Sequence, residues 1–300
     1  MILERFCDIY NKQIEPYINS LMKTFECDWE PIKYTLDKGR NRFRSALAVI
    51  SGNINHLNPE LSSTIGAISE LLHTALIIQD DIADRDDFRR GDVAAWKRFG
   101  IDRALFSCEQ VIAVAIINAF SILKEEATVH LIQTIFDVNS GQSVQTRSTF
   151  KDNLSKDLLQ KIHHDKTALG RWALTCPCAI NSNSQLFQIF DSYARLLGEA
   201  GCLKNDLENM IVNNNYDSTN MDLSISRATL PLLRLTKLVQ ITESTDRSTI
   251  KKLLYATGVY SSCKVDIEHA INKAIQLLQK LHESPEKKLL VEWAKYHLAI

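Results

Sequence analysis

Opposite charges are concentrated at residues 73–91, which read HTALIIQDDIADRDDFRRG and hold five aspartates and three arginines in nineteen positions. In a helix, Asp80 and Asp84 lie one turn apart on the same face, with Asp81 beside them. Like charges at this spacing destabilise a helix by roughly a few tenths of a kcal/mol, so the face favours a bound cation. Mg²⁺ takes oxygen ligands and is usually held by one or two carboxylates together with substrate phosphates.

Two arginines close the same run. Arg89 and Arg90 carry planar, forked guanidinium groups that suit bidentate contact with phosphate oxygens. His73 precedes Asp80 by about two helical turns and so lies on nearly the same face. Carboxylates that hold a metal beside arginines that hold phosphate predict a site for a diphosphate. An isolated DDxxD is more often a solvated acidic turn, so this prediction depends on further matches along the chain.

Helices are the elements expected to position these groups. The 300 residues are 45% hydrophobic and include only 10 glycines and 6 prolines, and the apolar residues recur mostly three and four positions apart. Ser155 is placed as an N-cap, and Ser284 followed by Pro285 opens another helix. Residues 106–138 are expected to form two helices that meet near Glu125. We therefore expect one all-α domain over residues 1–300 with ten or so helices.

Charge and cysteine content exclude several classes of protein. Thirty-five basic and 36 acidic residues leave a formal charge of -1, which gives no general electrostatic basis for binding nucleic acid or a membrane surface. The seven cysteines are irregularly spaced without a CxxC pair, as in a reduced cytoplasmic protein. The longest apolar run, residues 111–123, is shorter than the roughly 20 residues that span a bilayer. We expect a cytoplasmic protein without stable membrane insertion.

The sequence resembles the polyprenyl synthetase family, the trans-isoprenyl diphosphate synthases. The family pattern ExxHxAxxxxDDxxD followed by RRG stands here as ELLHTALIIQDDIAD and RRG. Further family elements follow the same order: GRNRFRSAL (39–47), GQ (141–142), KTALG (166–170), GEAGCLKNDLEN (198–209) and SRATLPLL (226–233). The resemblance spans roughly residues 30–240. It implies an isoprenoid synthase-type helical bundle around a central apolar cavity and, as the family usually has, a homodimer.

The resemblance also implies a reaction: Mg²⁺-dependent condensation of an allylic diphosphate with isopentenyl diphosphate to a longer trans-polyprenyl diphosphate. The residues expected to bind Mg²⁺ and the allylic diphosphate are Asp80, Asp81, Asp84, Arg89, Lys166, Thr167 and Arg227. Those expected at the diphosphate of isopentenyl diphosphate are Arg44, His73 and Arg90, with Asn41 where the family has lysine. Gln142 of the GQ element is a further substrate contact, and Asn205 and Asp206 are the expected second metal-binding region.

Several positions depart from the family pattern. Asn41 replaces the lysine that would bind isopentenyl diphosphate, and Arg40 could compensate from the next position. The second aspartate-rich region, DDxxD in the family, is Asn205-Asp206-Leu207-Glu208-Asn209, so four carboxylates stand where an intact pair of motifs has six. The expected lid, residues 212–222, contains no lysine or arginine. These changes predict reduced or redirected chain elongation.

Two other functions fit part of the pattern. Asn205, Asn209 and Asn213 are spaced like the metal motif of terpene cyclases, which share the fold, although Asn213 stands where that motif has glutamate. A cyclase, or a prenyltransferase with another acceptor, would tolerate a damaged isopentenyl diphosphate site. A non-catalytic partner subunit is the third alternative, against which the intact first motif argues.

Product length is expected to depend on the positions four and five residues before the first aspartate, where bulky aromatics block growth in this family. Here they are Leu76 and Ala75, which predicts a geranylgeranyl or longer product. Alternatively, Ala75 only eases helix packing, and Phe120 from a neighbouring helix forms the floor.

Overall fold

The computed structural model describes residues 1–39, 41–149, 152, 154–211, 228–242 and 245–298. These residues form two compact units. The described parts of unit 1 are residues 1–135 and 169–191, and those of unit 2 are residues 136–168, 192–211 and 228–298. Almost all regular structure in them is helical, which confirms the all-α prediction. A single domain over residues 1–300 stays a prediction.

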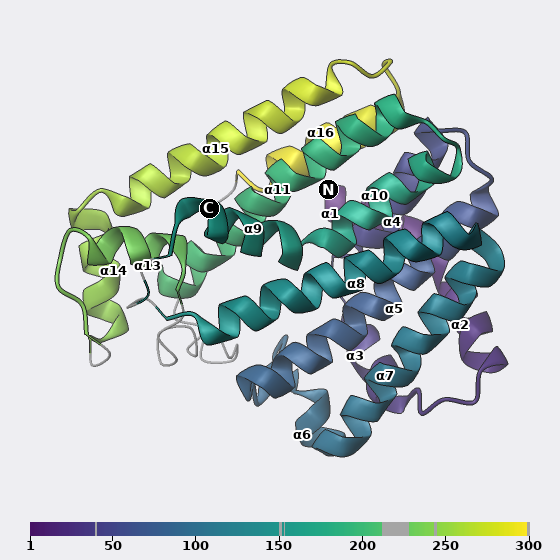
Figure 1. The fold of residues 1–300 in the computed structure, drawn as a ribbon, viewed down its shortest axis with the longest axis horizontal. Coiled ribbons are helices and arrows are strands. Elements are labelled where there is room, and N and C mark those ends of the chain that lie inside the picture. Colours follow the sequence, from purple (N-terminus) through teal and green to yellow (C-terminus); the bar gives the residue numbers. More distant parts are fainter. Residues whose placement is uncertain (40, 150–151, 153, 212–227, 243–244, 299–300) are drawn as a thin grey trace. The chain divides into compact units, whose positions relative to one another are not determined.

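Unit 1 is built around one long helix. Its elements are α1 (Ile2–Ile9), the π-helical η1 (Tyr10–Ile14), α2 (Glu15–Thr24), α3 (Glu30–Leu36), α4 (Phe43–Ile54), α5 (Pro59–Asp84), α6 (Ala95–Phe99), α7 (Ile101–Asn118), the π-helical η2 (Ala119–Leu123) and most of α10 (Ala168–Ile180). Helix α5 packs between α4 and α7 (Figure 1). Because α5 has neighbours on several faces, it is apolar nearly all round and buried along most of its length.

Helix α5 has well-defined ends. The Asn58 side chain accepts a hydrogen bond from the Glu60 backbone N–H at 2.9 Å, with Pro59 in the first turn. At the other end, Arg85 adopts the left-handed conformation with φ of 55°. The Asp86 N–H then bonds back to the Asp81 carbonyl at 2.9 Å. Helix α5 therefore stops directly after the aspartates of the first motif.

Directly after α5, β1 (Phe88–Arg89) pairs antiparallel with β2 (Asp92–Val93). Arg90 and Gly91 form the two-residue turn with φ of 56° and 86°, the signs that a type I′ hairpin requires. Strands of two residues are too short to produce an alternating pattern, so neither strand is predictable from the sequence. The hairpin places Arg89 against Asp81 at the end of α5 and Arg90 in its turn.

Helices α8 (Lys124–Arg147) and α11 (Ser184–Ile211) contribute residues to both units. The other helices of unit 2 are α9 (Lys156–Lys166), α13 (Leu230–Thr236), α14 (Arg247–Ala256), α15 (Val259–Leu278) and α16 (Pro285–Tyr296). Helix α15 lies along α16 (Figure 1). The two helices predicted to meet near Glu125 are α7 and α8, and they join through η2 rather than through a loop.

Two predicted helix starts in unit 2 are confirmed. Ser155 caps α9 by accepting from the Leu158 N–H at 3.1 Å. Ser284 caps α16 by accepting from the Lys287 N–H at 3.1 Å, with Pro285 as the first helical residue. The hydroxyl in each case satisfies a backbone donor that has no partner inside the helix.

Candidate active site

The C-terminal end of α5 gathers the acidic residues of the first motif. Asp81 and Asp84 are buried, whereas Asp80 is partly exposed one turn before Asp84. The carbonyl end of a helix carries partial negative charge, so carboxylates placed there favour a bound cation. The Asp81 Oδ2 atom is buried and lacks a hydrogen-bond partner in the described structure. This set of oxygens suits a hard cation such as Mg²⁺.

Arg89 neutralises part of this charge in a way that the sequence did not predict. Its Nε donates to Asp81 Oδ1 at 2.7 Å, its Nη2 bonds the same oxygen, and Nη2 lies 3.5 Å from Asp86 Oδ2. Burial raises the pKa of Asp81 to about 6, while Arg89 acts in the opposite direction. Arg89 was predicted to contact a diphosphate, but here its guanidinium is engaged with two aspartates. The spacing of residues in the sequence does not determine which nearby carboxylate an arginine will bind.

No preformed metal cage occurs in the described part of the chain, where no three carboxylate, imidazole or thiol groups converge closely enough. A Mg²⁺ ion that completes its octahedron with water and substrate phosphate needs only one or two protein carboxylates. Asp80 and Asp84, on one face at the helix end, meet this smaller requirement.

A second feature of unit 1 is a small basic cavity. Its volume is about 60 Å³, and its wall includes four predicted substrate-binding residues: Asn41, Arg44, His73 and Arg90. Asn41 follows α3, Arg44 lies in the first turn of α4, His73 is on α5, and Arg90 is in the hairpin turn. Four separate parts of unit 1 thus bring these side chains together.

Electrostatics in this cavity favour an anion. Burial lowers the pKa of Arg44 to about 10, with Glu70 opposing and Arg90 adding to the effect. The pKa of His73 is held well below its ordinary value, first by burial and then by Arg44 and Arg90, so the ring is neutral at pH 7. The Arg44 Nε is buried without a hydrogen-bond partner among the described residues. A donor of this kind is costly unless a ligand accepts from it.

A buried ion pair supports one side of the cavity. Arg42 Nη1 lies 3.3 Å from Glu70 Oε2, and Arg42 Nη2 donates to the Leu36 carbonyl at 2.6 Å. Glu70 also accepts from the Ser45 hydroxyl at 3.1 Å. Neither Arg42 nor Glu70 was assigned a role from the sequence, although Glu70 begins the ExxH pattern. Arg40, suggested as a substitute for the missing lysine, lies outside the described residues.

In unit 2, Lys166 and Thr167 stand where α9 ends. The Lys166 ammonium donates to Gln145 Oε1, and the Thr167 hydroxyl donates to the His163 carbonyl at 2.7 Å. Gln142, the predicted substrate contact, lies one turn before Thr146, whose hydroxyl donates to the Gln142 carbonyl at 2.9 Å. In this structure Lys166 therefore uses Gln145 as its partner, a residue that the sequence did not single out.

Two motif glycines have packing roles in the same region. A Cβ at Gly198 would lie 2.3 Å from Thr167 Oγ1, and one at Gly141 would lie 2.8 Å from the Asp165 Cβ. Both distances are too short for a side chain, so these glycines allow α11 and α8 to approach the end of α9 closely. Close helix packing therefore accounts for the glycines in the GQ and GEAG elements.

The altered second motif lies near the end of α11. Asn205 is exposed, and Asp206 Oδ2 is 3.8 Å from His163 Nε2. Burial lowers the pKa of His163 to about 4, so this ring is neutral at pH 7. The Asn209 carbonyl accepts a hydrogen bond from Arg247 Nη2. Arg227, Asn213 and the expected lid at 212–222 lie outside the described residues.

The residues predicted to control product length differ in burial. Ala75 is fully buried in a hydrophobic cluster with Cys108 and Val111 of α7, and its carbonyl accepts from the Cys108 thiol at 3.4 Å. Leu76 is half-buried. Phe120 is 65% exposed, and its role as the floor of the cavity stays a prediction.

Comparison with known proteins identifies the class of enzyme. The polyprenyl synthetase family profile matches residues 29–274, so the chain belongs to this family. Octaprenyl diphosphate synthase of Escherichia coli is 23% identical over 292 residues, covering 89% of this chain and 87% of that protein. A short chain isoprenyl diphosphate synthase of Methanothermobacter thermautotrophicus is 21% identical over 318 residues, covering 99% and 97%.

The fold agrees with this assignment. A polyprenyl synthase from Caulobacter crescentus, crystallised with calcium and isoprenyl diphosphate, superposes with a TM-score of 0.87 at 18% identity, covering 99% of this chain and 98% of that one. The protein is a trans-isoprenyl diphosphate synthase, a prenyltransferase of isoprenoid biosynthesis.

Proposed function

We propose that isopentenyl diphosphate binds with its diphosphate at the cavity formed by Arg44, His73 and Arg90. The observation that supports this most strongly is the buried Arg44 Nε, which has no hydrogen-bond acceptor within the described structure. Arg42, His73 and Arg90 line the same cavity. Phosphate oxygens would supply the acceptor and relieve the repulsion between Arg44 and Arg90. The neutral His73 can donate one hydrogen bond to the same group.

The allylic diphosphate is proposed to bind at the end of α5, where Asp80 and Asp84 would hold Mg²⁺. When bound, Mg²⁺ stabilises the negative charge that grows on the departing diphosphate. Asp81, paired with Arg89 at 2.7 Å, holds the arginine of the hairpin beside this position. Release of Arg89 from Asp81 toward the diphosphate would then accompany substrate binding.

Four further residues are proposed as contacts of the allylic diphosphate, as the resemblance to the family implies: Lys166, Thr167, Gln142 and Arg227. The carbon–oxygen bond of the allylic substrate breaks, and the double bond of isopentenyl diphosphate attacks the resulting cation before a proton is lost. The protein contributes by positioning the two substrates and excluding water from the cation.

The second acidic region is proposed to bind metal weakly through Asn205 and Asp206. An amide carbonyl is a neutral ligand, so each asparagine in place of aspartate removes charge from the site. Slow elongation is the expected consequence. The deciding experiment supplies Mg²⁺ and a panel of allylic diphosphates with and without isopentenyl diphosphate. Longer prenols that require isopentenyl diphosphate support the proposal, whereas hydrocarbons formed without it would indicate a cyclase, and no turnover would indicate a partner subunit.

Product length is proposed to be geranylgeranyl or longer, because position 75 holds a small alanine where an aromatic side chain would block growth in this family. Ala75→Phe is expected to shift the products toward fewer carbons, as read by chromatography of the dephosphorylated prenols. The site is tightly packed, so the variant is also expected to lose about 1–3 kcal/mol of stability from overpacking.

Ala67→Phe provides the matched control for that loss, because Ala67 is fully buried in the same cluster on the same helix, eight residues away. It should destabilise the fold to a similar degree. An unchanged product distribution in Ala75→Phe, with the enzyme still active, would show that Ala75 serves helix packing alone.

Homodimer formation is proposed to use the exposed apolar side of residues 101–132. Two segments of the described chain, 59–84 and 101–123, are long and apolar enough to cross a membrane by composition. In the most apolar 18-residue stretch of each, 78% of the first is buried in the fold against 39% of the second. The large apolar side chains exposed here are Ile101, Leu105, Phe106, Ile117, Phe120, Ile122, Val129 and Ile132. An exposed apolar surface of this extent is typical of a protein interface, and we propose that a second copy of the cytoplasmic enzyme covers it.

Charged substitutions test this interface. Phe106→Glu combined with Phe120→Glu is expected to convert a dimer into a monomer in sedimentation-velocity experiments, because both rings are 65% exposed and would be buried on association. Leu238→Glu is the control, since Leu238 is 61% exposed on unit 2. A wild-type protein that sediments as a monomer at micromolar concentration would contradict the proposal.

A further inference from the structure

Unit 2 contains a larger cavity whose wall does not include the predicted site residues. Its volume is about 460 Å³, and it lies among helices α9, α11 and α15, with Leu230 of α13 at one edge. This volume falls within the usual range for small-molecule sites, roughly 300–1,000 Å³. The cavity is therefore large enough for a ligand of its own.

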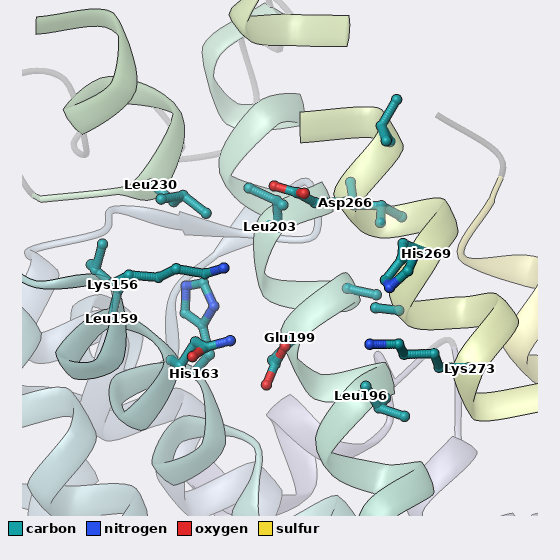
Figure 2. Close-up of a pocket in the computed structure, with 15 residues that line it drawn as sticks. Lys156, Leu159, His163, Leu196, Glu199, Leu203, Leu230, Asp266, His269 and Lys273 are labelled. Atoms are coloured by element: carbon teal, nitrogen blue, oxygen red, sulfur yellow. The ribbon is translucent and has the colours of Figure 1, made fainter. Parts of the chain in front are cut away.

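The lining of this cavity has an apolar part and a basic part. The apolar part comes from Leu159 on α9, Leu196, Ala200 and Leu203 on α11, and Ile267 and Ala270 on α15. Lys156 and Lys273 extend into the cavity from opposite sides, from α9 and α15 (Figure 2). Neither ammonium has a hydrogen bond or ion pair with another residue that the structure describes.

Two carboxylates also line the cavity, and both already have partners. Glu199, which lies between the two lysines in Figure 2, is 2.6 Å from His164 Nε2. Asp266 Oδ2 accepts from Arg234 Nη2 at 2.5 Å. Arg234 neutralises Asp266, and Glu199 offsets one of the two lysine charges, so the lining keeps an excess of positive charge.

We propose that this cavity binds an amphipathic anion, a short hydrocarbon chain that carries a phosphate or carboxylate head group. The chain would contact the leucines and alanines, and Lys156 and Lys273 would each offer a charge-assisted contact to the head group beside Glu199. His163 lines the same cavity and lies 3.8 Å from Asp206, so an occupant would touch a neighbour of the second acidic region. This site is separate from the substrate sites of the proposed function and does not depend on them.

Calorimetric titration of the full chain in EDTA, with octyl phosphate as the probe, tests the proposal. Wild-type protein is expected to bind one octyl phosphate per chain, and Lys156→Gln and Lys273→Gln are each expected to weaken binding about tenfold, the loss of one charge-assisted contact. Octan-1-ol and inorganic phosphate should bind far more weakly, because each provides only half of the recognised chemistry. Titration with octanoate identifies the class of natural ligand. If octyl phosphate binds more tightly than octanoate, the ligand is a phosphorylated lipid; if octanoate binds more tightly, the ligand is a fatty acid.

Lys264→Gln is the matched control. Lys264 lies nine residues before Lys273 on α15, on the opposite face of the helix, and its ammonium stacks over Tyr260 outside the cavity. Its replacement should leave the affinity unchanged. The proposal is overturned if wild-type protein gives no binding at millimolar probe, if octanol binds as tightly as octyl phosphate, or if the three lysine variants have equal affinity.

Discussion

Asp80→Asn is expected to lower kcat for prenyl transfer about a hundredfold or more while leaving the fold intact. Asp80 is partly exposed at the end of α5, so an isosteric amide should cost little stability. Loss of the Asp80 carboxylate removes negative charge from the position proposed to hold Mg²⁺. Loss of one group that stabilises transition-state charge typically lowers the rate by about 10²–10³. Steady-state kinetics with saturating Mg²⁺, beside thermal melting of the variant, measure both effects.

Asp87→Asn is the control for that experiment. Asp87 belongs to the same acidic run but pairs with Lys97 at 2.7 Å, with the Asp87 side chain 47% exposed. Its replacement makes the same chemical change a short distance away and should leave kcat within about twofold, since an exposed pair of this kind contributes little. Near-normal turnover of Asp80→Asn would refute the assignment of Asp80 to the metal.

Arg44→Gln is expected to raise the KM for isopentenyl diphosphate about 10- to 100-fold, with a much smaller effect on the allylic substrate. Arg44 lines the small basic cavity, and its Nε is buried without an acceptor in the described structure. A charge-assisted contact to phosphate is worth roughly 1.5–3 kcal/mol. Initial rates with each substrate varied in turn separate the two diphosphate sites.

The pKa of His73 provides a second measurement on the Arg44→Gln variant, one that does not depend on turnover. Arg44 is one of the charges that lower the pKa of His73, so its removal should raise the pKa of His73 toward the ordinary value, as followed by NMR of the imidazole protons. Arg85→Gln is the control, because Arg85 is exposed beside the same motif and should change neither quantity. An equal rise in KM for both substrates would contradict a separate isopentenyl diphosphate site.

Helix periodicity and capping chemistry account for what could be predicted. Ser155, Ser284 and Pro285 mark helix starts by local rules that do not depend on the rest of the fold. The spacing of His73 and Asp80 places them on nearly one face of α5, and the ordered motifs predicted that Asn41, Arg44, His73 and Arg90 would share a site. The structure brings those four side chains to one cavity.

The sequence alone could not predict which of several neighbouring groups each charged side chain would bind. Arg89 pairs with Asp81 and Lys166 with Gln145, because each cation binds an acceptor that the fold places within reach. The same limit applies to Ala75, where spacing cannot decide between a cavity wall and a packing contact with Cys108. Such choices depend on three-dimensional distances and on side-chain rotamers.

Electron paramagnetic resonance of bound Mn²⁺, used in place of Mg²⁺, tests the central claim most directly. In the presence of a non-reactive allylic thiodiphosphate, wild-type protein should bind Mn²⁺ tightly, and the double variant Asp80→Asn, Asp84→Asn should bind it at least about tenfold more weakly. Equal Mn²⁺ affinity in the two proteins would mean that the acidic end of α5 does not hold the metal.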